Sequence, residues 1–241
     1  MENIALQFGL TQPTTCSYLP EKQEQLAVLI GPEPIEADTY SQLITYNFRR
    51  SGDQIYRPHC AACSACQSLR ILVSDFQPSA AQRRILNKAQ RERWHYKLSD
   101  APQIDSAEYT ELFALFSRYI AFKHADSVMF PATDEQLHSL LHSYWQPIRL
   151  LKLYQADVLM AVSIIDDLSD SFSAVYTFFA AEGARFSPGK LAILYLLDFA
   201  ATTDRRFVYL GYQIEGCQKM AYKSEFRPHQ RFFNGYWHSF A

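Results

Sequence analysis

Four cysteines are the most reactive side chains that the sequence gathers. Cys60, Cys63 and Cys66 form a C-x2-C-x2-C run, and Cys16 lies far upstream. Four thiolates suit either a Zn ion or an iron–sulfur cluster. A zinc ribbon usually carries two separated C-x2-C pairs, so a single compact run weakens the Zn interpretation. Buried thiols without a metal remain the alternative.

A strongly basic segment follows the cysteines. Ser79 and Gln82 have the spacing of a capping box, which predicts that a helix begins there and runs on to about residue 98. On that helix Arg84, Lys88 and Arg91 share one face. Like charges three or four residues apart cost helix stability, so the run favours an anionic partner such as phosphate. A solvated helix face is the alternative.

Two later segments also carry groups that suit an anionic ligand. Residues 178–194 run from a strand through a loop to the start of a helix, where free N–H groups and Lys190 favour an anion. Residues 209–232 are dense in tyrosine, lysine and arginine, which suits base stacking and pairing with phosphate or carboxylate. An ordinary helix cap and a surface turn are the respective alternatives.

Familiar catalytic motifs are not found. The sequence has no Ser-His-Asp pattern, no H-E-x-x-H and no suitably spaced pair of carboxylates. Asp166 and Asp167 are predicted to form a turn at the end of a strand. Cys217 has no identifiable base nearby and is predicted to be a semi-buried thiol rather than a nucleophile.

The elements that must position these groups predict an α+β protein. The chain has 241 residues, a length that suits one large domain or two small ones. Of these residues 48% are apolar, and the net charge is −2. We expect a hairpin at Ser51-Gly52-Asp53, helices capped by Asp38 and Asp105, and a helix starting at Thr133. Beyond residue 148 we expect a three-strand meander, a helix opened by Ser187, and a last strand.

Targeting signals do not appear in the sequence. No stretch approaches the ~20 apolar residues of a membrane-spanning helix, and the N-terminus lacks a basic start followed by an apolar run. We therefore expect a cytoplasmic protein without a membrane partner.

Several blocks of the sequence resemble a known family over nearly the whole chain. The family is that of the bacterial aspartate/glutamate leucyltransferases, relatives of the eukaryotic arginyl-tRNA–protein transferases of the N-end rule pathway. The blocks are CSYLP, FRRSGDQIYRPHCAACSACQSLRILVSDFQPSAAQRR, YTFF, SPGKLAIL, YLGYQIEGCQKMAYKSEFRPHQ and NGYWH.

The resemblance implies a fold, a reaction and two substrates. A small N-terminal cysteine-containing domain (residues 1–98) is followed by a GNAT-like acyltransferase domain (residues 103–241). The implied reaction moves leucine from leucyl-tRNA to the α-amino group of proteins that begin with Asp or Glu. Arginine from arginyl-tRNA is the alternative donor, and a GNAT N-acetyltransferase using acetyl-CoA or a metal-dependent RNA-binding module are the rival functions.

The resemblance also assigns roles to residues. It requires no cofactor for catalysis, and it favours an iron–sulfur cluster over Zn at Cys16, Cys60, Cys63 and Cys66. The predicted catalytic residues are Tyr176, Tyr212 and Tyr222, those for the acidic N-terminus are Arg70, Lys219, Lys223 and Arg227, and those for tRNA are Arg83, Arg84, Lys88, Arg91, Ser187, Gly189 and Lys190.

Overall fold

An eight-stranded sheet organises most of the chain. The computed structural model describes residues 6–31 and 35–241, and the strands of this sheet lie in the order β14-β13-β7-β12-β11-β10-β9-β8. Neighbouring strands are antiparallel, except that β11 and β12 are parallel. The strands are β7 (Gln67–Leu72), β8 (Trp94–Asp100), β9 (Ile148–Gln155), β10 (Val158–Asp167), β11 (Ser171–Phe179), β12 (Phe207–Gln213), β13 (His229–Phe233) and β14 (Tyr236–Phe240).

A smaller sheet is built from the N-terminal residues. Its four strands lie in the order β1-β4-β6-β5, and β2 pairs with β3 separately. These strands are β1 (Phe8–Leu10), β2 (Thr14–Thr15), β3 (Gln23–Glu24), β4 (Leu26–Leu29), β5 (Arg49–Ser51) and β6 (Gln54–Pro58). Gly52 turns the chain between β5 and β6 with a φ of 57°, which confirms the predicted hairpin.

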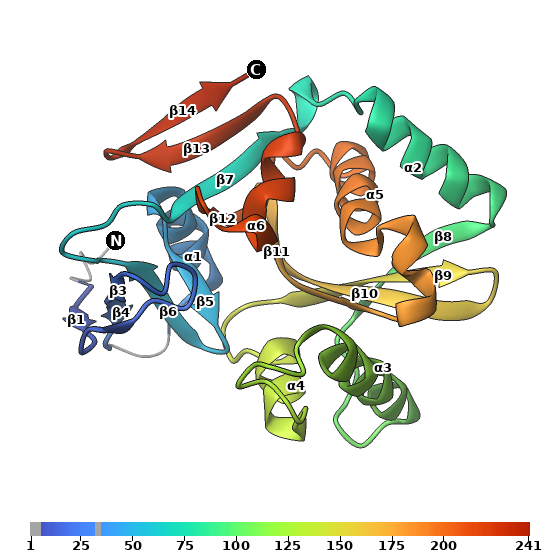
Figure 1. The fold of residues 1–241 in the computed structure, drawn as a ribbon, viewed down its shortest axis with the longest axis horizontal. Coiled ribbons are helices and arrows are strands. Elements are labelled where there is room, and N and C mark those ends of the chain that lie inside the picture. The colour runs from blue at the N-terminus through green and yellow to red at the C-terminus, as the bar shows by residue number, and fades with distance from the viewer. Residues whose placement is uncertain (1–5, 32–34) are drawn as a thin grey trace.

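Helices cover both faces of the large sheet. In Figure 1, α2 and α5 lie on one face and α3 and α4 on the other, while α1 belongs to the N-terminal part. The helices are α1 (Ala37–Leu43), α2 (Ala80–Arg91), α3 (Ala107–Lys123), α4 (Asp134–Leu141), α5 (Pro188–Thr202) and α6 (Gln218–Ala221). The α+β class expected from the sequence is confirmed.

The hydrophobic core explains this layering. Residues 159–166 of β10 are all buried, as a strand between two helical layers requires. A second cluster joins Tyr40 and Ile44 of the N-terminal part to Phe207 and Tyr209 of β12. The N-terminal elements therefore pack directly on the large sheet.

The large sheet also takes strands from the N-terminal half of the chain. β7 lies between β13 and β12, and β8 forms the edge beside β9. The expected boundary between residues 98 and 103 thus falls at the end of an edge strand and does not separate the two sheets. The closing hairpin β13–β14 was not anticipated from the sequence.

The helix predicted to run to residue 98 is wrong in its last part. α2 ends at Arg91, and residues 94–98 belong to β8. Arg93 adopts a φ of 57°, which stops the helix, and the buried Trp94 then pairs opposite Gln155 of β9. Tertiary pairing here overrides a continuous helical pattern.

Two predicted helix caps are wrong by one or two residues, whereas the capping box at Ser79 and the helix start at Thr133 are confirmed. Asp38 lies in the first turn of α1 rather than at its N-cap. Ser106, not Asp105, caps α3, because its hydroxyl accepts from the backbone N–H of residue 109 at 3.1 Å. The capping boxes that begin at Ser79 and Thr133 are both present.

Candidate active site

The parallel strands β11 and β12 separate near the centre of the large sheet. In the described chain they pair at Ser171–Ser173 and Phe207–Tyr209, although β11 continues to Phe179 and β12 to Gln213. On its other side, β12 has a bulge before Gly211 in its pairing with β7. The facing edges beyond that point do not pair with each other. Backbone groups on such edges can bind an extended ligand.

A group of tyrosines lies at this separation, with α3 on one side. The rings of Tyr119 and Tyr176 meet edge-on with centroids 6.2 Å apart. Tyr222 lies close enough to raise the pKa of Tyr119 further, after burial has raised it, to about 12. Burial also raises the pKa of Tyr176 and of Tyr222. All three hydroxyls are thus protonated at neutral pH and can donate hydrogen bonds.

His124 stands at the C-terminal end of α3 beside the same tyrosines. Its ring centroid lies 5.5 Å from that of Tyr119. Burial, and then the charge of Lys219 on α6, lower the pKa of His124, while Asp126 opposes this shift. The imidazole is therefore largely neutral at pH 7 and can accept a proton. Lys219 itself is exposed.

Tyr212, the third predicted catalytic tyrosine, faces the N-terminal sheet. Its hydroxyl donates to the carbonyl of Asn47 at 2.9 Å, and the Arg49 guanidinium lies 5.5 Å from its ring. Lys223 is buried close by and donates to the Tyr212 carbonyl at 2.8 Å. Burial, and then Arg49, lower the pKa of Lys223 to about 7. The structure does not bring the Tyr212 hydroxyl to Tyr176.

The cations predicted to bind an acidic N-terminus are spread over several places. Arg70 is stacked between the rings of Phe207 and Trp237, at 3.9 and 4.0 Å from their centroids. It also donates to Gln230 at 2.8 Å, so most of its bonding capacity is used within the fold. Arg227 is exposed and donates to the carbonyl of the C-terminal residue. These side chains do not form one pocket with Lys219.

A buried ion pair fastens the N-terminal sheet to the large one. Arg50 Nε donates to Asp166 Oδ1 at 2.7 Å, and both side chains are almost fully buried. Tyr40 donates to the other carboxylate oxygen at 3.4 Å. Burial raises the pKa of Asp166, and the Arg50 guanidinium opposes that rise. The sequence-based assignment of Asp166 to a turn is therefore wrong.

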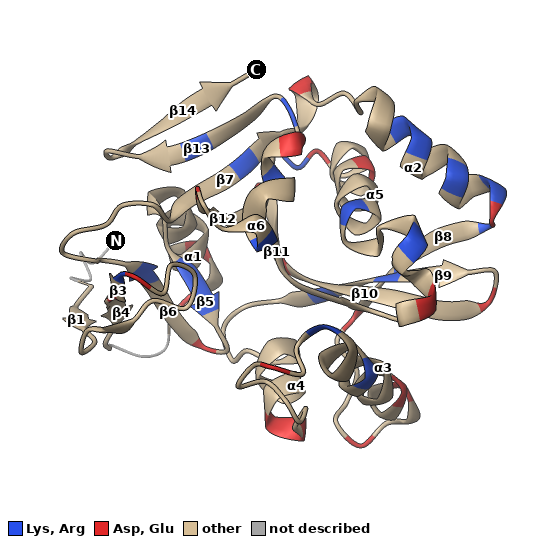
Figure 2. Ribbon diagram, in the orientation of Figure 1, with Lys and Arg blue, Asp and Glu red and all other residues tan. Residues whose placement is uncertain are grey.

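The basic face of α2 lies next to the start of α5. Figure 2 shows Lys and Arg positions following one another along α2. Arg84 and Arg91 are exposed, and Lys88 is half-buried with its Nζ donating to the Arg185 carbonyl at 2.9 Å. Arg185 is also exposed. We call Arg84, Lys88, Arg91 and Arg185 the basic ridge. Arg83, also predicted for tRNA, is exposed and donates to the Pro78 carbonyl.

The N-terminus of α5 adjoins the basic ridge. Ser187 occupies its N-cap with a φ of 53°, and no side chain caps the helix. Backbone N–H groups such as that of Gly189 are therefore open to an anion. Lys190 pairs with Glu225 at 2.6 Å, which offsets part of its charge.

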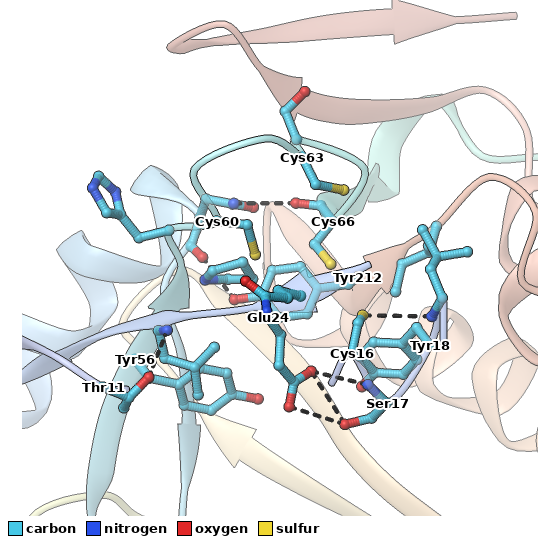
Figure 3. Close-up of a pocket in the computed structure, with 18 of the residues that line it drawn as sticks. Thr11, Cys16, Ser17, Tyr18, Glu24, Tyr56, Cys60, Cys63, Cys66 and Tyr212 are labelled. Carbon is cyan, nitrogen blue, oxygen red and sulfur yellow. Dashed lines mark hydrogen bonds between the residues drawn. The ribbon is translucent and has the colours of Figure 1, made fainter. Parts of the chain in front are cut away.

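The four cysteines predicted to bind a metal line one pocket of about 610 Å³ (Figure 3). All four are free thiols. Burial, and then the other three thiols, raise the pKa of Cys66 to about 12. Across residues 6–31 and 35–241, however, no group of three His, Cys, Asp or Glu side chains has an arrangement that could hold a metal ion. The thiols are gathered but do not form a preset ligand shell, so we assign no step of the chemistry to a metal.

Comparison with protein families decides the class of this arrangement. Residues 14–84 match the family described as "Arginine-tRNA-protein transferase, N terminus", and residues 111–233 match its "C terminus" counterpart. The chain belongs to the arginine-tRNA-protein transferase family. It is accordingly an aminoacyltransferase, which confirms the identification made from the sequence.

Relatives match the chain from end to end. It is 43% identical over 236 residues to the aspartate/glutamate leucyltransferase of Aeromonas salmonicida, covering 98% of this chain and 96% of that one. The aspartate/glutamate leucyltransferase of Pseudoalteromonas atlantica is 42% identical over 237 residues, covering 96% of each.

Solved structures bear on the fold alone. L-PGS from Bacillus licheniformis superposes with a TM-score of 0.50 at 15% identity, over 73% of this chain and 58% of that one. The GNAT-like fold expected for the second half is confirmed.

Sequence reasoning missed several residues that the structure brings to these sites. Tyr119 and His124 were assigned only to an amphipathic helix, and Arg185 to a loop. Arg49 and Arg50 were seen only as flanks of a hairpin. Adjacent arginines in a segment that also supplies buried apolar residues were a usable signal, because buried guanidinium groups need partners. In the described part of the chain, no helix combines the length and the apolar character needed to cross a bilayer.

Proposed function

We propose that this transferase moves leucine from leucyl-tRNA to the α-amino group of proteins that begin with Asp or Glu, and that it does so in the cytoplasm. The observation that carries this proposal is the end-to-end match, at 42–43% identity, to proteins named aspartate/glutamate leucyltransferase. The family establishes aminoacyl-tRNA and a protein as the substrate classes. Leucine and the acidic acceptor are the finer part of the proposal.

The reaction needs no covalent enzyme intermediate and no cofactor. The amine nitrogen attacks the ester carbon of the aminoacyl-tRNA, a C–N bond forms, and the bond to the ribose oxygen breaks. The amine loses one proton and the ribose oxygen gains one. An α-amino group has a pKa of roughly 8, so a neutral nucleophile is available near pH 7. Positioning, oxyanion stabilisation and proton transfer are what the protein must supply.

The separated ends of β11 and β12 are the place we propose for the ester. Tyr176 and Tyr222 would donate hydrogen bonds to the oxyanion and to the departing ribose oxygen. His124, which the lowered pKa keeps largely neutral, lies beside Tyr119 and would act as the base for the acceptor amine. The unpaired strand edges would align the amino-acid moiety in an extended conformation.

The surroundings of Tyr176 support leucine over arginine as the donor residue. Phe116 and Tyr119 present aromatic rings to it at 6.3 and 6.2 Å, and its hydroxyl contacts the Met129 sulfur at 3.8 Å. Within residues 6–31 and 35–241, no carboxylate bonds to Tyr176. An apolar side chain gains from such a setting, whereas a guanidinium would lose hydration without a counter-charge.

The basic ridge supports tRNA as the carrier. A row of Arg and Lys on one helix face gives affinity for phosphates without reading sequence. Its position beside the open N-terminus of α5 adds a further anion-binding group. The acceptor stem would lie along the ridge and its 3′ end would reach the separated strands.

The test is a transfer assay with two charged tRNAs and matched peptides. Radiolabelled leucyl-tRNA and arginyl-tRNA are each offered to peptides that begin with Asp or Asn. We expect label to move from leucyl-tRNA to the Asp peptide. Equal transfer of arginine would remove the donor assignment. If neither label moves while acetyl-CoA acetylates the peptide, the acetyltransferase alternative replaces the proposal.

A further inference from the structure

Arg49 is a buried guanidinium with an unused edge. The residue is 6% exposed, and its Nη1 donates to the carbonyls of Phe48 at 2.6 Å and Ile44 at 3.3 Å. Its Nε and Nη2 are buried and have no hydrogen-bond partner within the described part of the chain. Leaving charged donors unpaired in the interior is costly, so such an arrangement calls for an explanation.

The neighbouring arginine shows what this edge is suited to bind. Nε and Nη2 lie on the same side of a guanidinium and form a planar two-pronged donor. Arg50 turns these two atoms toward Asp166 Oδ1, at 2.7 and 2.5 Å. Within residues 6–31 and 35–241, no carboxylate pairs with the equivalent edge of Arg49. Two adjacent arginines therefore share one acid, and one positive charge is left over.

The neighbouring groups that the structure describes do not supply the missing anion. The oxygens of Asp166 already accept from Arg50 and Tyr40. Lys223 cannot do so, because its side chain carries either a positive charge or none, and Arg49 helps to lower its pKa. The rings of Tyr209 and Tyr212 lie 5.3 and 5.5 Å from the guanidinium, and aromatic faces cannot neutralise its charge.

Arg49 lies directly behind the cysteine-lined pocket. It pairs across the hairpin with Tyr56, and its guanidinium lies by the Tyr212 ring. Tyr56 and Tyr212 both line that pocket, as Figure 3 shows. A volume of about 610 Å³ admits the first residues of a peptide. Because the free edge is shut off from solvent, a ligand must move a tyrosine ring to reach it.

We infer that the Nε and Nη2 edge of Arg49 binds the side-chain carboxylate of the acceptor protein's N-terminal Asp or Glu. The carboxylate would enter through the cysteine-lined pocket and pair with both donors, whereas Asp166 meets Arg50 through the single oxygen Oδ1. This inference rests on the proposed function and assigns its acidic-residue site to Arg49 rather than to Arg70 or Arg227. Lys223, also on this side of β12, is the one earlier candidate that it retains.

Another charge on the pocket wall suits the same ligand. Glu24 lines the pocket and accepts hydrogen bonds from Ser17 N and Oγ. A ligand with a carboxylate alone would be repelled by it. The N-terminal residue of an acidic acceptor also carries an α-amino group, so Glu24 would attract the incoming residue, and the amine would leave Glu24 when it attacks the ester.

The test compares Arg49→Met with the adjacent Arg50→Met on C-terminally amidated peptides beginning with Asp or Asn. We expect Arg49→Met to lower kcat/KM for the Asp peptide by about a hundredfold, chiefly through KM, and to leave that for the Asn peptide nearly unchanged. Its urea midpoint should equal or exceed that of the wild type, because an unpaired buried charge is removed. Arg50→Met should instead lower the midpoint, because Asp166 loses its partner.

Direct binding keeps the proposal testable if transfer fails or a variant does not fold. Calorimetry without tRNA measures Asp-Ala-amide and Asn-Ala-amide on the wild type and on Arg49→Lys, which keeps the charge but loses the planar fork. We expect the wild type to prefer the Asp compound and the variant to lose most of that preference. An unchanged preference overturns the role of Arg49, as does equal loss on both peptides in the transfer assay. If the wild type prefers Asp-Ala-amide but transfers no leucine, the proposed function is wrong and the assignment of Arg49 as a carboxylate site is supported.

Discussion

The buried pair Arg50–Asp166 should be the main fastening between the two sheets, and Asp166→Asn tests it. The substitution keeps the size and shape of the side chain and removes only its charge. Arg50 then keeps its bond to the Gly52 carbonyl at 3.0 Å but has no counter-charge for a side chain that is 1% exposed. Breaking a buried pair by removing one partner costs about 3–5 kcal/mol.

Asp167→Asn is the matched control, one residue further along β10. Asp167 pairs with Arg205 at 2.7 Å, but these side chains are 21% and 25% exposed. A pair in contact with solvent contributes about 1 kcal/mol or less. The same chemical change therefore has a severalfold smaller expected effect on the neighbouring residue.

Urea unfolding followed by tryptophan fluorescence measures both variants. Trp145 packs on Tyr40 with ring centroids 5.1 Å apart, so it reports on the region around the pair. We expect the free energy of unfolding to fall by about 3–5 kcal/mol in Asp166→Asn and by about 1 kcal/mol or less in Asp167→Asn. Equal, small losses in the two variants would refute the view that this ion pair holds the sheets together.

Three further predictions follow from individual charges. The pKa of Lys223 is lowered to about 7, so between pH 7 and 10 the unfolded chain holds a proton that the folded chain does not. In urea titrations, the free energy of unfolding of the wild type should therefore rise by roughly 1 kcal/mol per pH unit more than that of Lys223→Met. Parallel slopes in the two proteins would contradict this. Replacing Arg84, Lys88 and Arg91 by Gln should weaken tRNA binding and reduce the slope of log binding constant against log salt concentration by about 2. The exposed Arg118 on α3 is the control, and Arg118→Gln should change neither quantity. Filter binding at several salt concentrations measures both. Metal analysis and absorbance near 400 nm after anaerobic purification test the cysteine-lined pocket. If it holds an iron–sulfur cluster, the protein should contain iron and be coloured. An active, colourless, metal-free protein would exclude a required cluster.

Local signals in the sequence were enough for much of the fold. The capping boxes at Ser79 and Thr133 fixed the starts of α2 and α4, and the turn at Gly52 fixed the β5–β6 hairpin. These features depend on residues three or four apart, which a single sequence displays directly. The same holds for the basic face of α2, since helical spacing alone puts its charges together.

Long-range pairing was out of reach for the same reason. Nothing local says that β7 lies between β12 and β13, or that residues 94–100 leave a helix to pair with β9. Asp166 looked like part of a turn because its partner Arg50 is 116 residues away in sequence. The grouping of the tyrosines is also invisible in the sequence for this reason. Tyr176 and Tyr222 come together through Tyr119, whereas Tyr212 points to the other side of β12.

The two kinds of cationic site match the two substrates that the proposal requires. The three arginines of the basic ridge are exposed, so each contributes little alone, and together with Lys88 they suit a polyanion that can bind in many registers. Arg49 is desolvated and offers one planar pair of donors, so it suits a single carboxylate and rejects an amide, which cannot accept on both atoms. Discrimination between Asp and Asn at an N-terminus depends on that one difference in charge and acceptor number. A desolvated guanidinium with two coplanar donors can make this distinction, and a surface lysine in water cannot.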